Sequence, residues 1–196
     1  MVTIAITGGI ACGKSLVGCY LAEVGVPVCD ADDLARDVVA QGERAYEEIV
    51  AEFGRWILRA TGEIDRAALG REVFGDARRL ARLNALTHPA IMQRLRAWVA
   101  AMAGAGGHAA AVIPLLYEIR DECNWGAVVC VSAPERAQLT WLGERGMAPD
   151  EARQRLAAQL PLAQKMERAD YVIFNCGTRE LLRQQTNRVW ASICGE

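Results

Sequence analysis

The eight residues GGIACGKS (8–15) decide the fold. They follow an apolar run, TIAIT (3–7), and lead directly into the helical pattern KSLVGCYLAEVG (14–25). The stretch fits the pattern G-x-x-x-x-G-K-S/T, in which the backbone N–H groups of a loop between a strand and a helix surround phosphate oxygens. A chance glycine-rich turn would lack this strand before it and this helix after it. We therefore predict a nucleotide-phosphate site at the start of an α/β fold.

Each fixed position of the loop has a chemical reason. Gly8 and Gly13 allow backbone conformations that other residues rarely adopt. Lys14 is expected to reach the β- and γ-phosphates, and the Ser15 hydroxyl to ligate Mg²⁺. The helix that begins near Lys14 directs its positive N-terminal end at the same anion. The predicted nucleotide contacts run through the whole loop: Gly8, Gly9, Ile10, Ala11, Cys12, Gly13, Lys14, Ser15 and Leu16.

Cys12 is an unusual residue for this loop. Its neighbours, Lys14 and a helix N-terminus, favour a thiolate and hence a reactive, redox-sensitive side chain. The alternative is that Cys12 replaces a residue of serine size in a loop whose phosphate contacts come from the backbone. We favour the second interpretation.

Composition predicts a soluble globular protein. The 196 residues suffice for one well-cored domain, and the net charge of −2 provides no electrostatic attraction for nucleic acid or an anionic membrane. No apolar stretch approaches the ~18 residues of a membrane span, and no signal peptide is recognisable. Seven cysteines without a C-x-x-C pair indicate reduced thiols. We therefore expect a cytoplasmic protein, monomeric or a small homo-oligomer, with no nucleic-acid or membrane partner.

Five short apolar runs alternate with helical patterns along the chain. Most of them are continuously apolar, as is typical of parallel strands that are buried on both faces. Their alternation with helices predicts a parallel sheet covered by helices on both sides. The predicted strands are TIAIT (3–7), VPVCD (26–30), AAAVIPLLY (109–117), AVVCVSA (127–133) and YVIFNC (171–176).

Helical periodicity is clearest in AYEEIVAEFGRWIL (45–58) and in residues 182–193, where apolar side chains recur at helical spacing. The stretch 60–104 is also mostly helical in pattern. It is longer than a parallel crossover requires, so we expect a substrate-facing insertion there. The rest of the single domain is then a core of about 1–59, 105–140 and 160–196.

A phosphate-binding loop by itself does not separate kinases from GTPases or motor ATPases. The D-x-x-G and N-K-x-D patterns of GTPases do not occur, and the third predicted strand reads VIPLLYE rather than ending in the acidic residues of a motor ATPase. The chain carries DAD (30–32) at the end of the second predicted strand, which this topology allows to lie close to the first. Asp30 or Asp32 can there take a proton from an attacking hydroxyl. Alternatively, Asp30 caps the helix that follows.

Several stretches together resemble the dephospho-CoA kinase family, and the similarity covers nearly the whole chain. DAD (30–32), HP (88–89) and IPLLYE (113–118) at these separations are uncommon in other kinases that have this loop. The resemblance implies transfer of the ATP γ-phosphate, with Mg²⁺, to the ribose 3′-hydroxyl of dephospho-CoA. It also implies a three-layer α/β/α fold with a five-stranded parallel sheet, a helical substrate-binding insertion and a mobile lid. The other similar stretches are TGGIACGKS (7–15), VPVCDADDLAR (26–36), GEIDRAALGREVF (62–74), LTHPAI (86–91), ERGMAPDEARQRLAAQ (144–159) and ADYVIFNCGT (169–178).

The resemblance implies roles for residues on both substrates. Asp32 matches the base for the ribose hydroxyl, and Lys14 would neutralise charge on the transferred phosphoryl group. Arg66 and His88 match the region that receives the acceptor, although His88 and the following proline can equally end a helix. Asn175 matches the loop that touches the adenine of ATP.

The IPLLYE stretch matches a motif that faces the substrate cleft. Pro114 and Leu115 belong to its apolar part, which is also explained as protein core. Glu118 closes the stretch and is expected to help place the substrate or a metal-bound water. The resemblance therefore adds Pro114, Leu115 and Glu118 to the expected substrate site.

The stretch ERGMAPDEARQRLAAQ (144–159) resembles the mobile lid of the family, and the resemblance implies a lid over about 141–159. Pro149 suits the first turn of a helix, and two acidic residues follow it. An arginine brought over the phosphates on closure stabilises transition-state charge. Arg145 precedes a glycine and matches the family pattern, whereas Arg153 and Arg155 are equally explained as a solvated helix face.

The chain departs from the family pattern at five positions. Of these, Trp141 has the clearest consequence, because it stands where an arginine is common. We expect Arg145, four residues further on and on the same face of a helix, to compensate. The others are Ala11 for glycine, Cys12 for serine, Leu16 for threonine and Phe174 for aspartate.

Two other functions remain open at this point. The chain can be another kinase with a phosphate-binding loop, acting on a nucleoside or nucleotide. It can also be a catalytically silent relative that only binds nucleotide or CoA species. Lys14, Ser15 and Asp32 are all present, so we expect an active kinase.

Overall fold

The structure, a computed structural model, describes residues 2–73, 76–119 and 123–195. It divides into two compact units, the first made of Met1–Asp30 and Trp98–Glu196 and the second of Ala31–Ala97. Residues 31–59, which we expected in the core, thus cluster with residues 60–97 of the expected insertion, and residues 98–104 cluster with the first unit. Two residues of that expected insertion, 74 and 75, lie outside the described residues.

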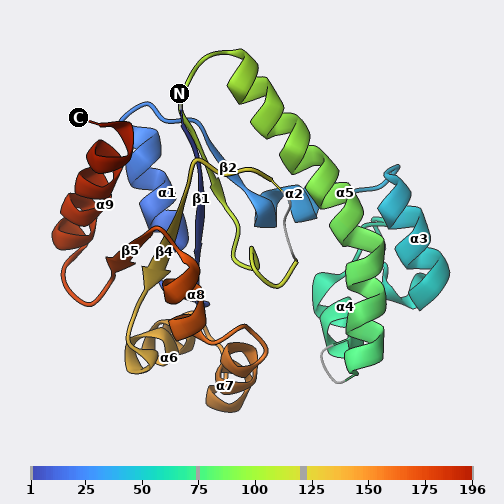
Figure 1. The fold of residues 1–196 in the computed structure, drawn as a ribbon. Coiled ribbons are helices and arrows are strands. Elements are labelled where there is room, and N and C mark those ends of the chain that lie inside the picture. The colour runs from blue at the N-terminus through green and yellow to red at the C-terminus, as the bar shows by residue number, and fades with distance from the viewer. Residues whose placement is uncertain (1, 74–75, 120–122, 196) are drawn as a thin grey trace. The chain divides into compact units, whose positions relative to one another are not determined.

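A five-stranded parallel sheet forms the centre of the first unit (Figure 1). All five predicted strands are confirmed, and their order in the sheet is β2-β3-β1-β4-β5. The strand β3 thus lies between β2 and β1, which are not direct neighbours. The strands are β1 (Thr3–Gly8), β2 (Val28–Asp30), β3 (Ala109–Val112), β4 (Ala127–Ser132) and β5 (Tyr171–Phe174).

β3 is shorter than the apolar run from which it was predicted. It ends at Val112, and the N–H of Ile113 makes the last bond toward β1, to the Ile6 carbonyl at 2.8 Å. Pro114 follows and has no N–H with which to continue the ladder. The residues after it turn away from the sheet and place IPLLYE at the carboxyl end of β3.

Helices cover both faces of this sheet, as predicted. Ile4 and Ile6 of β1 pack with α1 (Lys14–Glu23) and α9 (Arg179–Cys194), which lie side by side (Figure 1). Successive side chains of a strand point to opposite faces, so Thr7 faces the other layer. There its hydroxyl and the Lys165 ammonium of α8 (Leu162–Arg168) both donate to the Pro114 carbonyl. The three-layer α/β/α arrangement is therefore confirmed.

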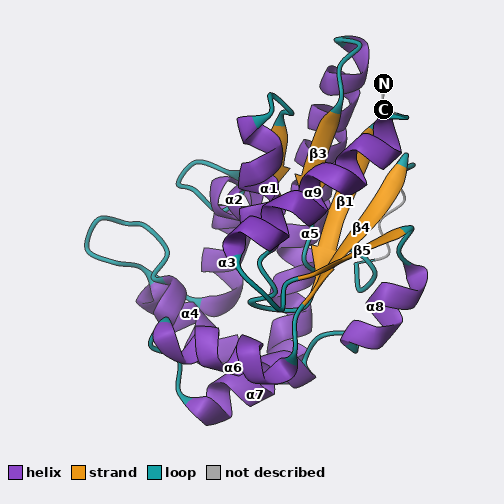
Figure 2. Cartoon of the chain, turned by 90° about the vertical axis from the view of Figure 1, so that its left-hand side faces the viewer, coloured by secondary structure: helices purple, strands orange, loops and turns teal. Residues whose placement is uncertain are grey.

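Two short helices, α6 (Glu135–Glu144) and α7 (Pro149–Ala157), lie beyond the carboxyl ends of the strands (Figures 1 and 2). The turn between them contains Gly146 with φ +83°. The prediction that Pro149 stands in a first helical turn is confirmed, and Asp150 and Glu151 occupy that turn as well. In the described part of the chain, no helix has both the length and the apolar character that a bilayer crossing needs.

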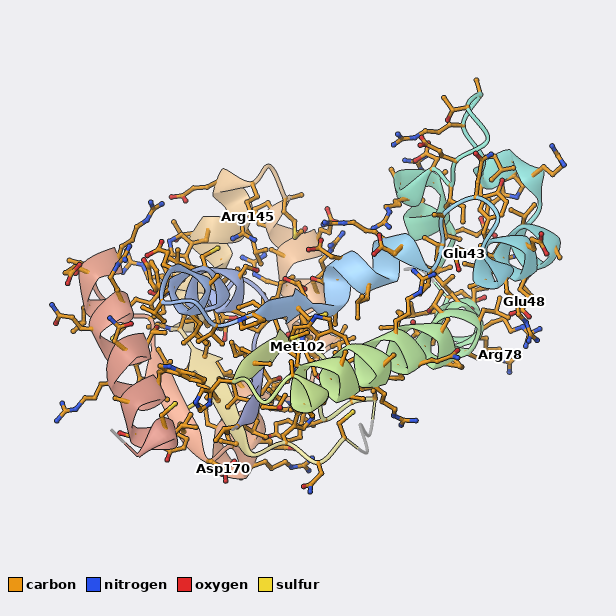
Figure 3. All side chains as sticks on the ribbon, turned by 90° about the horizontal axis from the view of Figure 1, so that it is seen from above. Glu43, Glu48, Arg78, Met102, Arg145 and Asp170 are labelled. Carbon is orange, nitrogen blue, oxygen red and sulfur yellow. The ribbon has the colours of Figure 1, made fainter. Side chains whose placement is uncertain are left out.

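The second unit is helical. Its core cluster includes Ile49, Ile57 and Leu69. Ion pairs of 2.9 Å and 2.7 Å, Arg82–Glu52 and Arg94–Glu43, tie its last helix to its second one (Glu43 is marked in Figure 3). The elements are α2 (Ala31–Asp37), α3 (Arg44–Phe53), the 3₁₀ turn η1 (Arg55–Ile57), α4 (Arg66–Val73) and α5 (Ala77–Gly104), whose end belongs to the first unit.

Two helix boundaries differ from the predicted ones. The helix expected over 45–58 ends at Phe53, because Gly54 takes φ +89°, a conformation that stops an α-helix. The suggestion that His88 and Pro89 end a helix is wrong, since α5 continues through both residues. Pro89 removes one N–H donor from the helix. α5 nevertheless continues for several turns on either side of it, so the remaining backbone hydrogen bonds maintain the helix.

Candidate active site

The phosphate-binding loop has the backbone that its glycines predict. Gly8 takes φ +140° and Gly13 φ +97°. A Cβ atom on Gly8 would lie 2.1 Å from the Val131 carbonyl oxygen, so only glycine fits where β1 passes β4. Between the glycines, Ala11 takes φ +58°, a left-handed conformation that is rare for residues with a side chain. Such strain persists where surrounding contacts impose it, and it is common at ligand sites.

Lys14 lies folded over this loop. Its ammonium donates to the Gly9 carbonyl at 2.7 Å and to the Gly8 carbonyl at 3.3 Å, and the residue is 8% exposed. Ser15 is exposed in the first turn of α1. Among the described residues no side chain caps α1, and its first turn carries no acidic residue. The N–H groups and the positive end of the helix are thus directed to an anion from outside the chain.

Burial changes the expected chemistry of Cys12. The side chain is fully buried, and a Cβ atom on Gly9 would lie 3.0 Å from its sulfur. Burial raises the pKa of the Cys12 thiol and outweighs the attraction of Lys14 for the thiolate. Burial also raises the pKa of the neighbouring Cys130 thiol to about 11. The reasoning that Lys14 and the helix activate Cys12 is therefore wrong, and the geometry agrees with the interpretation as a space-filling residue.

We expect iodoacetamide at pH 8 to modify Cys19 and Cys176, which are exposed, and to leave Cys12 and Cys130 intact in the folded protein. Mass spectrometry of peptides after a timed reaction measures this difference. The same reaction in denaturant is the control, because all four thiols should then react. Labelling of Cys12 as fast as of Cys19 in the folded protein would contradict the interpretation.

Two amide side chains hold the loop from outside. The Asn175 amide nitrogen, just beyond β5, donates to the Cys12 carbonyl at 3.1 Å. The Gln159 side-chain oxygen, at the end of the lid stretch, accepts from the Ile10 N–H at 2.9 Å. Asn175 thus lies on the loop itself, and its expected contact with adenine stays a prediction. Gln159 was not predicted, because a glutamine in a polar helical stretch carries no sign of such a contact.

The IPLLYE stretch is joined to α8 by a buried charge pair. Lys165 is fully buried, and its ammonium lies 2.7 Å from a Glu118 oxygen and 2.8 Å from the Pro114 carbonyl. The same Glu118 oxygen, Oε1, accepts from the Leu160 N–H at 2.9 Å. The second oxygen, Oε2, is buried without a hydrogen-bond partner among the described residues. The structure therefore engages Glu118 with Lys165, a partner that the sequence did not suggest, while Leu115 is half-buried beside it.

Charged residues expected to serve the acceptor gather in the second unit. Asp32 is exposed in the first turn of α2, and Arg66 is the first residue of α4. Desolvation lowers the pKa of the Arg66 guanidinium, the nearby Arg36 cation lowers it further, and the Asp32 carboxylate opposes both. Asp65 fixes the start of α4 by accepting from two backbone N–H groups at 2.9 and 3.1 Å. Asp32, Arg36 and Arg66 thus form one charged cluster.

His88 belongs to the same unit but has a different environment. It lies half-buried in α5. Burial lowers the pKa of its imidazole, so the ring is neutral at physiological pH. It is suited to hydrogen bonding rather than to binding an anion by charge.

The arginines of the lid stretch are not equivalent. Arg153 pairs with Asp150 at 2.9 Å and Arg155 with Glu151 at 2.8 Å, both within α7. Arg145 is exposed at the carboxyl end of α6 (Figure 3) and has no ion-pair partner in the part of the chain that is described. Trp141, on α6, packs against the main hydrophobic core. Where the resemblance leads us to expect an arginine, the chain thus has a partly buried apolar side chain that carries no charge.

The sequence matches known proteins along nearly its whole length. The model of the family described as dephospho-CoA kinase matches residues 2–180. A dephospho-CoA kinase of Geobacillus kaustophilus is 48% identical over 185 residues, which are 93% of this chain and 92% of the relative. One from Anaeromyxobacter dehalogenans is 45% identical over 198 residues, covering 100% of this chain and 93% of the relative.

Solved structures agree with this match. The Thermus thermophilus protein TT1252 superimposes with a TM-score of 0.79 at 32% identity, over 97% of each chain. Dephospho-CoA kinase from Campylobacter jejuni gives a TM-score of 0.72 at 24% identity over 98% of each chain, a likeness of fold alone. The loop, the sheet order and the near-complete sequence match lead to one conclusion: this chain belongs to the dephospho-CoA kinase family.

Proposed function

We propose that this chain transfers the γ-phosphate of ATP to the ribose 3′-hydroxyl of dephospho-CoA, giving coenzyme A and ADP. This is the last step of coenzyme A biosynthesis. The observation that carries the proposal is the match at 48% identity over 93% of the chain to a dephospho-CoA kinase. The phosphate-binding loop, with Lys14 folded over it and an uncapped helix behind it, supports the choice of donor.

On the donor side, the loop binds the triphosphate through N–H groups other than that of Ile10, which donates to Gln159. The Lys14 ammonium, which donates to the Gly8 and Gly9 carbonyls of the loop, reaches the β- and γ-phosphates when ATP binds. Its charge stabilises the negative charge that develops on the transferred group. The exposed Ser15 hydroxyl would hold a Mg²⁺ ion that enters with ATP. The donor set suits such an ion, because Mg²⁺ commonly takes few protein ligands and completes its shell with phosphates and water; when bound it neutralises phosphate charge.

On the acceptor side, Asp32 removes the proton from the ribose 3′-hydroxyl. A general base must lie within hydrogen-bond reach of that proton, and an exposed carboxylate in a first helical turn is accessible to substrate. Arg66 and Arg36 beside it supply positive charge suited to the diphosphate of dephospho-CoA. His88, Pro114, Leu115 and Glu118 remain proposed contributors to the acceptor site, and Asn175 to the adenine site.

We further propose that the enzyme works in the reducing cytoplasm, as a monomer or a small homo-oligomer. All seven cysteines are free thiols, including two that are exposed. Such a set is typical of proteins kept reduced after synthesis.

Changing Arg145 to alanine is expected to lower kcat at least about tenfold, because a guanidinium over the phosphates stabilises transition-state charge. Steady-state rates with saturating ATP and dephospho-CoA measure this effect. Arg153→Ala is the matched control: it removes an arginine that pairs within α7 and should leave kcat within about twofold. Equal rates for Arg145→Ala and the wild type would remove Arg145 from the mechanism.

One assay tests the proposed function. ADP release from Mg·ATP is measured with dephospho-CoA and, in parallel, with a panel of nucleosides and nucleoside monophosphates. Strong stimulation by dephospho-CoA, with coenzyme A identified by mass, is the expected result. Stimulation by a panel member alone would indicate a different small-molecule kinase. No stimulation by any acceptor, with ATP still bound, would indicate a silent relative.

A further inference from the structure

The phosphate-binding loop is held at one specific peptide by the lid stretch. The Gln159 side-chain oxygen accepts from the Ile10 N–H at 2.9 Å. The next residue along the loop is Ala11, whose φ of +58° is unfavourable for alanine. The Ile10 N–H belongs to the Gly9–Ile10 peptide, which precedes the two peptides that flank Ala11, and the bond fixes how the Gly9–Ile10 peptide is turned. Gln159 is therefore placed to impose the shape that the loop needs for phosphate.

The residue that follows Gln159 is bonded to a charge pair whose lysine is fully buried. The following residue, Leu160, donates its N–H to Glu118 Oε1 at 2.9 Å. That oxygen is 2.7 Å from the ammonium of Lys165, which is fully buried. Removing one member of a buried charge pair is strongly unfavourable, so we expect the Glu118–Lys165 pair to stay intact. The end of the lid stretch is thus anchored to IPLLYE while its adjacent side chain reaches the loop.

The opposite side of the loop has a comparable contact. Asn175 donates to the Cys12 carbonyl at 3.1 Å, and a Cβ atom on Gly13 would lie 2.6 Å from its amide nitrogen. The loop is therefore hydrogen-bonded on both sides of the strained residue Ala11. Gln159 binds the N–H of the residue before it, and Asn175 binds the carbonyl of the residue after it. Of the two side chains, only Gln159 lies on the stretch that carries the lid arginines.

We infer that Gln159 is a positioning residue that couples the lid to the phosphate-binding loop. By holding the Ile10 N–H, it keeps the loop ready for the triphosphate, and it passes the presence of nucleotide on to α7. The Glu118–Lys165 pair is its anchor. This inference rests on the proposed use of ATP but not on the identity of the acceptor.

The test uses Gln159→Met, which keeps the length of the side chain and removes the acceptor oxygen. We expect the Kd for the non-hydrolysable analogue Mg·adenylyl imidodiphosphate, measured by calorimetry without any acceptor, to rise about tenfold. The matched control is Gln154→Met, the same change on an exposed residue of α7. Its Kd should equal that of the wild type. A Gln159→Met protein that binds the analogue as tightly as Gln154→Met would overturn the inference.

A second readout separates coupling from simple loss of affinity. Trypsin cleavage after Arg153 and Arg155 reports on the exposure of α7. We expect saturating analogue to slow this cleavage in the wild type and in Gln154→Met, and to leave it unchanged in Gln159→Met. Full protection of the Gln159→Met lid at saturating analogue would overturn the coupling. Since no acceptor is present, a failure of the dephospho-CoA assay leaves both readouts interpretable.

If Gln159→Met does not fold, Gln159→Glu provides a second test of the same inference. Glutamate retains an acceptor oxygen for the Ile10 N–H but adds a negative charge beside the loop. We expect a Kd for the analogue at least tenfold above that of the wild type, with the ratio between the two shrinking as salt rises from about 0.05 to 0.5 M. Wild-type affinity at low salt would show that residue 159 lies away from the bound phosphates, against the inference.

Discussion

Changing Asp32 to asparagine is expected to lower kcat by about 10²- to 10⁴-fold and to leave the KM for ATP within about twofold. Asparagine has the shape of aspartate and still accepts hydrogen bonds, but it cannot take the proton of the ribose hydroxyl. Asp32 is exposed at the start of α2, so we expect its replacement by an isosteric residue to leave the packing of the fold intact. Steady-state kinetics with each substrate varied in turn give both constants.

Two other aspartates make the Asp32 experiment specific. Asp37, exposed in the last turn of the same helix, is the matched control, and Asp37→Asn should retain the wild-type kcat within about twofold. Asp30 ends β2, and Asp30→Asn compares the two carboxylates of DAD directly. A kcat for Asp32→Asn within threefold of the wild type would show that Asp32 is not the base. A large loss confined to Asp30→Asn would move that role to Asp30.

The pattern of apolar residues predicts where the five strands lie in the sequence, but it does not predict the order of the strands in the sheet. Strands buried on both faces are continuously apolar, so each of the five is visible as a separate run. The position of β3 between β2 and β1 depends on how crossovers pack, which no local pattern encodes. Where the predicted length of a strand or helix was wrong, a single residue was responsible. Pro114 ended the regular ladder of β3, and Gly54 ended α3.

The residues of the candidate site also fall into those that the sequence predicts and those that it does not. Lys14 and Ser15 could be assigned from the sequence because a contiguous loop supplies its own geometry. Gln159 and Lys165 could not, since Gln159 meets a loop residue 149 positions away and Lys165 meets a carbonyl 51 positions away. Cys12 illustrates a third case. Its charged neighbour was visible in the sequence, but the burial that outweighs that charge exists only in the fold.

Changing Lys14 to methionine is expected to lower kcat by about a thousandfold, comparable to the loss of a preorganised donor to a developing negative charge. We also expect the KM for ATP to rise, since the ammonium is proposed to contact the β- and γ-phosphates before transfer as well. Methionine matches the length of lysine in a position that is only 8% exposed. The substitution therefore removes the charge and keeps most of the packing. Single-turnover rates with saturating ATP separate the transfer step from binding.

Stability and a second variant make the Lys14 result interpretable. In Lys14→Met the Gly8 and Gly9 carbonyls lose an ammonium at 3.3 and 2.7 Å, a cost of about 1–3 kcal/mol that should lower Tm by several degrees without unfolding the protein at 25 °C. Lys14→Arg restores the charge but replaces a compact ammonium with a planar guanidinium fork. We expect it to lose most activity as well, because the loop requires a point charge at one position and not merely a cation. A kcat for Lys14→Met within tenfold of the wild type would contradict the role of Lys14 in the transfer.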